Sequence, residues 1–251
     1  GVIKISWYAI SYICGILLCW FLILKIIKFK NIKISNKNVS DLIGNCMIGI
    51  IIGGRLGYVV FYNPEYYLNN IIDIFKIWNG GMSFHGGFIG VVIAIIYSSK
   101  SSRISLMVFS DLISIVSPIG IFFGRIANFI NGELYGKVTQ QKFGMVFPKG
   151  GNLPRHPSQI YEAFFEGLLL FIILWLLMSM TNFLNKSGLI TGCFIFLYGF
   201  FRFFVEFFRE PDIHIGYLYL DFSMGQLLSI PMIIIGLCFI IIFYNKNKNL
   251  I

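Results

Sequence analysis

The chain has 251 residues, of which 57% are hydrophobic and only 12% are charged, and its mean hydropathy is +0.80. An ordinary soluble domain is about 25% charged, so this composition leaves too little polar surface to cover a globule in water. It excludes a soluble enzyme, a disordered chain and a nucleic-acid-binding domain, despite a net charge of +9.

Apolar runs follow one another along the chain, each near the ~20 residues that an α-helix needs to cross a bilayer. They cover about 7–27, 42–62, 82–98, 106–124, 158–180, 188–208 and 222–244. We therefore predict an all-α integral membrane protein with about seven transmembrane helices, forming a single multispan domain over residues 1–251. The first run has no small-residue cleavage site, so we expect a membrane span there and not a signal peptide.

Lysine and arginine collect in the cytoplasmic loops of membrane proteins. Alternate loops place ten basic residues on one side of the membrane: Lys25, Lys28, Lys30, Lys33, Lys37, Lys100, Arg103, Lys186, Lys246 and Lys248. The opposite side receives six: Lys4, Lys76, Lys137, Lys142, Lys149 and Arg155. This bias predicts an extracytoplasmic N-terminus and a cytoplasmic C-terminus. The longest loop, 125–157 between spans four and five, is then extracytoplasmic.

The remaining four arginines lie in or beside spans: Arg55, Arg125, Arg202 and Arg209. A charge at the bilayer centre costs roughly 2.5–3.5 kcal/mol and usually has a function, although an arginine at a span end can instead snorkel to the interface. The spacing i, i+4, i+8, i+11 puts one polar stripe on a single helical face: Tyr198, Arg202, Glu206 and Arg209. An Arg–Glu pair could be purely structural. Two arginines beside one glutamate, however, leave an excess of positive charge that favours an anionic ligand such as a phosphate.

One histidine, His85, lies between the glycine pairs 80–81 and 86–87. Paired glycines indicate backbone that departs from a regular helix, which at membrane depth is found buried in protein or lining a wet cavity. Histidine is suited to moving a proton near neutral pH. The alternative is that His85 is a buried group whose hydrogen bonds are simply satisfied.

A polar segment follows Arg125, with Asn128, Asn131 and Glu133 among the glycines of a turn. Because Arg125 and Asn128 are three residues apart, one helical face could present both to the same ligand. The five cysteines lie in apolar stretches without CxxC spacing, so we predict neither a zinc site nor a disulfide framework.

Six segments carry a resemblance to a known family: GGRLGYVVFYNP (53–64), WNGGMSFHGGFIG (78–90), GRIANFINGELYGKVT (124–139), LPRHPSQIYEAFFEG (153–167), FRFFVEFFREPD (201–212) and SMGQLLSIPM (223–232). In this order they resemble the phosphatidylglycerol–prolipoprotein diacylglyceryl transferases. The resemblance implies a seven-helix enzyme of the bacterial inner membrane. Such an enzyme moves the diacylglyceryl group of phosphatidylglycerol to the lipobox cysteine of a prolipoprotein signal peptide and releases glycerol 1-phosphate, the first step of lipoprotein maturation. Its partners are these two substrates and membrane lipids, with no nucleic acid, metal or cofactor.

The resemblance also implies roles for particular residues. Arg125 matches the arginine that binds phosphatidylglycerol, Arg202 matches a second essential arginine, and His85 matches the candidate base. Further family positions, expected to bind substrate, are Tyr8, Asn128, Glu133, Gly136 and Glu206. Tyr198 and Arg209 join them because they share the polar stripe.

Two rival functions remain open from the residues. A transporter or channel could use the same arginines for an anion, and internal repeats would favour it; we see none. An intramembrane serine protease needs a nucleophilic serine in a glycine-rich turn and a histidine on a later span. Ser83 precedes His85 by only two residues, which suits neither a helix face nor a pair of spans.

Overall fold

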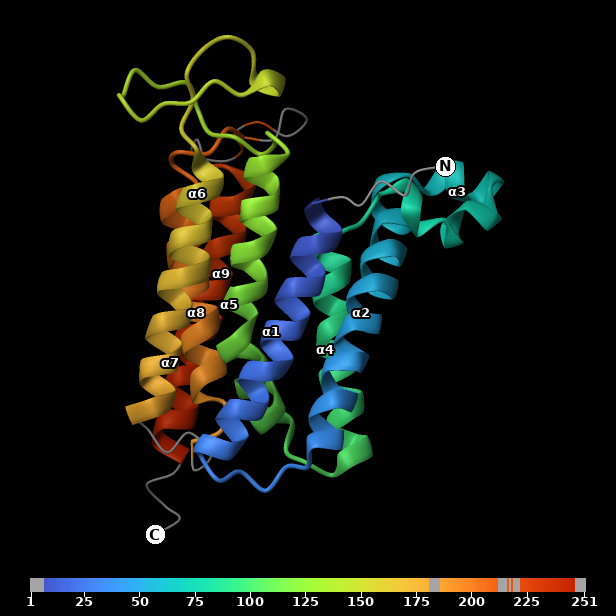
Figure 1. Cartoon of the computed structure of the whole chain (residues 1–251), viewed down its shortest axis with the longest axis vertical. Helices are drawn as coiled ribbons and strands as arrows, with labels where there is room; N and C mark the ends of the chain where they lie inside the picture. The colour runs from blue at the N-terminus through green and yellow to red at the C-terminus, as the bar shows by residue number, and fades with distance from the viewer. Residues whose placement is uncertain (1–6, 181–185, 212–215, 217, 219–221, 247–251) are drawn as a thin grey trace. The chain divides into compact units, whose positions relative to one another are not determined.

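The computed structural model describes residues 7–180, 186–211, 216, 218 and 222–246 (Figure 1). The long helices are α1 (Trp7–Phe29), α2 (Asn36–Tyr62), α4 (Phe84–Ser102), α5 (Leu106–Ile130), α8 (Leu189–Val205) and α9 (Met224–Lys246). One more helix is continuous over Ser158–Met180 and consists of α6 (Ser158–Glu162), the π-helical η4 (Ala163–Leu169) and α7 (Leu170–Met180). Six of these are long and apolar enough to cross a membrane, and α8 is a shorter apolar helix.

This architecture confirms the all-α membrane fold with about seven spans. Within the described residues the only strand-like pairings are isolated bridges. The described residues form two compact units, with boundaries inside α1 and α5. We call residues 23–109 the hairpin unit and residues 1–22 with 110–251 the bundle unit. Among the residues that set the predicted orientation, Lys4 and Lys248 lie outside the described residues.

Glycines bring α2 and α4 of the hairpin unit into direct backbone contact. A Cβ atom on Gly53 would overlap the carbonyl oxygen of Gly86, and one on Gly90 would overlap that of Gly49. Small residues are used in this way where membrane helices approach closely. The expectation of irregular backbone at both glycine pairs is therefore half wrong: residues 86–87 lie in regular helix, whereas Gly80 and Gly81 have φ of 81° and 78°.

Arg55 of α2 is buried and binds the backbone of the segment that follows α3 (Pro64–Asn69). This segment contains two short 3₁₀ helices, η1 (Ile71–Phe75) and η2 (Ile77–Asn79). The guanidinium donates to the carbonyl oxygens of Asp73 (2.6 Å), Ile74 (2.8 Å), Lys76 (3.2 Å), Gly80 (2.5 Å) and Gly81 (3.2 Å). The structure thus gives this arginine a structural role, as the organiser of a loop.

In the bundle unit, α5, the Ser158–Met180 helix, α8 and α9 run alongside one another (Figure 1). Side-chain hydrogen bonds cap the N-termini of α9 and α8. Ser223 and Gln226 form a capping box at α9, with Gln226 N–H donating to Ser223 Oγ (3.2 Å) and Ser223 N–H donating to Gln226 Oε1 (3.0 Å). Asp111 of α5 accepts the N–H groups of Gly188 (2.7 Å) and Thr191 (2.8 Å) and so caps α8 from a neighbouring helix.

The loop between α5 and α6 begins later than predicted. Helix α5 continues to Ile130, so Arg125 and Asn128 lie on its last turns and not in a loop that starts at residue 125. Beyond it the chain rises past the helix ends (yellow-green in Figure 1) and includes the short 3₁₀ helix η3 (Pro148–Gly150). Arg155 ties this segment together by donating to the carbonyl oxygens of Gly150 (3.0 Å) and Gly136 (3.2 Å) and to Glu210 (3.0 Å).

Candidate active site

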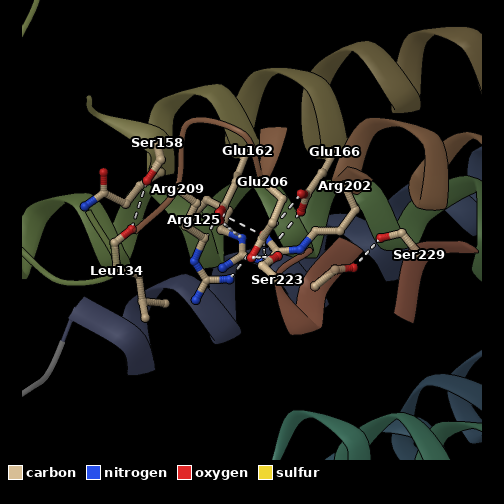
Figure 2. Close-up of polar contacts among 12 residues, drawn as sticks. Arg125, Leu134, Ser158, Glu162, Glu166, Arg202, Glu206, Arg209, Ser223 and Ser229 are labelled. Atoms are coloured by element: carbon tan, nitrogen blue, oxygen red, sulfur yellow. Dashed lines mark hydrogen bonds and ion pairs between the residues drawn. The ribbon is translucent and has the colours of Figure 1, made fainter. Parts of the chain in front are cut away.

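Three arginines and three glutamates meet inside the bundle unit (Figure 2). We call them the ion cluster: Arg125 from α5, Glu162 and Glu166 from the Ser158–Met180 helix, and Arg202, Glu206 and Arg209 from α8 and the turn after it. The glutamate side chains are at most 5% exposed, whereas those of the arginines are 11–18% exposed. The carboxylates therefore form the inner side of the cluster, and the arginines retain access to a ligand.

Glu162 is the central carboxylate of the cluster. One of its oxygens, Oε2, lies 2.8 Å from Arg125 Nε, while Oε1 lies 3.0 Å from Arg202 Nη1. Arg209 Nε is 3.8 Å from the same Oε1. Because its two oxygens hold different arginines, Glu162 sets the separation between the Arg125 and Arg202 side chains.

Glu166 bridges the same two arginines at longer range. Its Oε2 lies 3.5 Å from Arg125 Nη2, and its Oε1 lies 3.5 Å from Arg202 Nη1. Both contacts exceed the 2.7–2.9 Å of a strong charge-assisted hydrogen bond. Glu166 is thus a looser partner than Glu162, although it is just as deeply buried.

Glu206 completes the cluster beside the start of α9. Its carboxylate lies 2.9 Å from Arg202 Nη2 and accepts a hydrogen bond from Ser223 Oγ (3.0 Å). It also lies against the backbone of Gly225, where a Cβ atom would come within 2.6 Å of Glu206 Cδ. The N-terminus of a helix favours negative charge, so Ser223, Gly225 and α9 together fix this carboxylate.

A close helix approach brings Arg125 to the glutamates. Gly167 packs on Phe122 of α5, where a Cβ atom would come within 2.9 Å of the Phe122 Cα atom. The π-helical segment η4 includes both Glu166 and Gly167. Such segments are rare and are often found at functional sites. Here it combines the close approach with a glutamate aimed at the arginines.

The prediction that the arginines carry an excess of positive charge is wrong for the ion cluster. The sequence stripe gave two arginines and one glutamate, but the structure adds Arg125 together with Glu162 and Glu166, so three positive groups meet three negative ones. Sequence analysis assigned no role to Glu162, Glu166, Ser223 or Gly225. A signal for Glu166 was available, because an acidic residue inside an apolar span is rarely without a function.

A second polar group joins α1 to the end of α5. The Tyr8 hydroxyl donates to Glu133, and Asn128 Nδ2 donates to the Tyr8 hydroxyl. Asn131 Nδ2 also donates to Glu133, at 3.3 Å. The structure thus brings together three of the predicted substrate-binding residues. Gly136 instead pairs through its backbone with His156 and Arg209, and a Cβ atom there would come within 2.6 Å of the His156 carbonyl oxygen, so close packing requires a glycine.

Two predicted residues have simple surroundings. Tyr198 is buried on α8, one turn before Arg202, as the stripe predicts. His85 belongs to the hairpin unit, where it is exposed on the first turn of α4 with its ring centroid 5.7 Å from that of Phe84. A role for His85 beside the arginines therefore stays a prediction. Among the described residues, no group of three His, Cys, Asp or Glu side chains is placed to hold a metal ion.

Comparison with known proteins matches the chain to one family. Residues 1–242 match the family model described as prolipoprotein diacylglyceryl transferase. Proteins named phosphatidylglycerol–prolipoprotein diacylglyceryl transferase from Rickettsia felis and Rickettsia rickettsii are each 52% identical over 236 residues, which is 94% of this chain and 91% of theirs. The protein of that name from Rickettsia bellii is 49% identical over 241 residues, covering 96% of this chain and 92% of its own.

Proposed function

Since the chain belongs to the prolipoprotein diacylglyceryl transferase family, we propose that it transfers the diacylglyceryl group of phosphatidylglycerol to the cysteine thiol of a prolipoprotein lipobox. The observation that carries the proposal is the pair Arg125 and Arg202, half-buried among apolar helices and held apart by Glu162. The guanidinium fork matches phosphate oxygens in geometry as well as charge.

The reaction explains why arginines stand at the site. The cysteine sulfur attacks an sp3 carbon of the glycerol backbone, a carbon–sulfur bond forms, and the carbon–oxygen bond to phosphate breaks. The phosphodiester, with one negative charge, leaves as glycerol 1-phosphate with two, and the thiol proton is released to a base. Groups that stabilise the developing charge lower the barrier, and fixed guanidinium groups in a dry site suit this task.

Arg125 keeps donors available for the phosphate. Its Nε and Nη2 face the glutamates, while its Nη1 pairs with no group among the described residues. In our proposal the phosphate binds Arg125 through Nη1 and Nη2 and Arg202 through Nη1. Tyr198, Glu206 and Arg209 support the two arginines, and Tyr8, Asn128 and Glu133 bind the polar part of a substrate at the end of α5.

His85 is our proposed base for the thiol. A thiol has a pKa near 8.5, so most of it is protonated at pH 7 and needs help to ionise. The imidazole ring of histidine is a common proton acceptor in catalysis. Retention of activity by His85→Gln would remove it from the mechanism.

The distribution of basic residues supports a location in the bacterial cytoplasmic membrane, with the N-terminus and the 131–157 segment outside and the C-terminus inside. The thiol of an exported prolipoprotein then meets the enzyme at the outer side, near the end of α5 where Arg125 lies.

One reconstitution tests the function. Purified protein is incubated with phosphatidylglycerol and a lipobox peptide, and mass spectrometry follows the diacylglyceryl mass gain while released glycerol 1-phosphate is measured. A peptide with serine in place of cysteine is the control and should gain no mass. Arg202→Lys keeps the charge but loses the fork, so we expect a fall of about 100-fold in transfer with normal membrane insertion. Near-normal transfer by this variant would contradict bidentate phosphate binding.

A further inference from the structure

Two buried carboxylates compete for the same arginine pair. Glu162 and Glu166 each direct one oxygen to Arg125 and the other to Arg202, but Glu162 does so at 2.8 and 3.0 Å and Glu166 at 3.5 Å on both sides. Each therefore stands where a phosphate bridging the arginines would direct its own oxygens. The shorter contacts of Glu162 make it the stronger partner.

The charge balance makes one of these carboxylates a competitor of the substrate. Three guanidinium groups already neutralise three carboxylates in the ion cluster. A phosphodiester would add a fourth negative charge among side chains that are almost entirely shielded from water. An uncompensated buried ion costs several kcal/mol, so binding requires that one glutamate loosens its hold on the arginines.

We propose that Glu166 is the exchangeable counter-ion of Arg125 and Arg202, which the substrate phosphate replaces, while Glu162 stays in place and keeps the two arginines at a fixed spacing. This rests on the function proposed above. Glu206 cannot yield in the same way, because Ser223 Oγ, Arg202 Nη2 and the backbone at Gly225 enclose it. Glu162 cannot yield either without releasing both arginines.

The groups around Glu166 fit an exchange. It faces Arg125 from α5, Arg202 and Tyr198 from α8, and Glu162 one turn earlier on its own helix. Of these, Glu162 repels it and the arginines attract it only at 3.5 Å. When phosphate occupies the arginines, the repulsion between the two glutamates remains and moves Glu166 away from the arginine pair.

The two glutamates should respond to neutralisation in opposite ways. In Glu166→Gln the competitor for the arginines is gone, so the Kd for short-chain phosphatidylglycerol and the KM in transfer should both fall, by about three- to tenfold. In Glu162→Gln the arginines lose their spacer, so KM should rise and kcat should fall by tenfold or more. A purely structural role for Glu166 would lower kcat or stability without improving lipid affinity.

A matched control removes the same charge elsewhere. Glu210 forms its ion pair with Arg155 (3.0 Å), which is not an arginine of the ion cluster, so Glu210→Gln should leave the Kd for phosphatidylglycerol unchanged. Glu166→Met, uncharged and of similar length, should reproduce the gain in affinity and serves if the glutamine variant is unstable. A Kd for both Glu166 variants that is equal to or weaker than wild type overturns the proposal. Because lipid binding is measured without transfer, an inactive wild type would instead count against the proposed function.

Discussion

Replacing Gly225 by alanine distinguishes an effect on the stability of α9 from an effect on the ion cluster. Alanine is favoured over glycine in a helix by about 1 kcal/mol, so the change should not lower the stability of α9 and could raise it. The new Cβ atom, however, would lie 2.6 Å from Glu206 Cδ and 2.7 and 2.8 Å from its two oxygens. Ordinary van der Waals contact begins at 3.4 Å, so the carboxylate must retreat by at least about 0.8 Å.

That retreat determines the size of the effect. A retreat directly away from Arg202 would lengthen the Glu206–Arg202 contact from 2.9 Å to about 3.7 Å, beyond the ~3.2 Å limit of a good hydrogen bond, and would weaken the bond from Ser223. A hydrogen bond to a charged group contributes about 1.5–3 kcal/mol, and a shift of about 1 Å at a catalytic group can cost 100-fold in rate. We expect kcat/KM for diacylglyceryl transfer to fall by about 10- to 100-fold, with little change in the melting temperature.

The assay is transfer to a lipobox peptide, measured by mass spectrometry beside thermal unfolding of the same preparations. Gly124→Ala is the matched control, since Gly124 is also helical and adjoins Arg125 but has open space where the Cβ would go. Wild-type activity in Gly225→Ala would refute the argument that Glu206 must stay in place. An equal loss in Gly124→Ala would refute the steric explanation.

Three further outcomes follow from the structure. Arg55→Lys keeps the charge but cannot reach five carbonyl oxygens, so residues 71–81 should become sensitive to proteolysis; resistance equal to wild type would contradict the loop-organising role. Asp111→Asn places an amide against the N–H groups that start α8 and should cost about 1–3 kcal/mol in unfolding free energy, which denaturant titration measures. Burial, and then the charge of Lys137, lower the pKa of His156, so its neutral form is favoured in the folded segment. The unfolded form binds the proton first as pH falls below about 6.5, and hydrogen exchange of residues 134–157 should quicken there; exchange that His156→Gln leaves equally pH-dependent would exclude this histidine as the cause.

The spans were predictable because apolar runs of about 20 residues have few other uses. The end of span four was not, because hydropathy falls at Arg125 whether a helix stops there or continues into an ion cluster. In the structure α5 continues to Ile130, and Arg125 pairs with Glu162 and Glu166 on a different helix. No local pattern around Arg125 contains that information.

The arginines of the site and the counter-ion Glu206 were predictable, but the counter-ions Glu162 and Glu166 were not. Helical spacing places Arg202 and Glu206 on one face within a single segment, and the structure has them 2.9 Å apart. No spacing rule relates charged residues on different helices, so the net charge of the ion cluster could not be predicted from the sequence. The glycines at 86–87 show the same limit, because small residues serve irregular backbone and close helix contact equally well until the partner helix is known.

The Arg55 contacts have a consequence for how the chain enters the membrane. All five carbonyl partners lie 18 to 26 residues later in the sequence than the arginine that binds them. While the chain is being synthesised, α2 therefore emerges with a cation whose partners have not yet been made. Roughly 2.5–3.5 kcal/mol opposes leaving such a charge at the bilayer centre. Helix α2 is thus best inserted together with the segment that follows it, after Gly81 has left the ribosome.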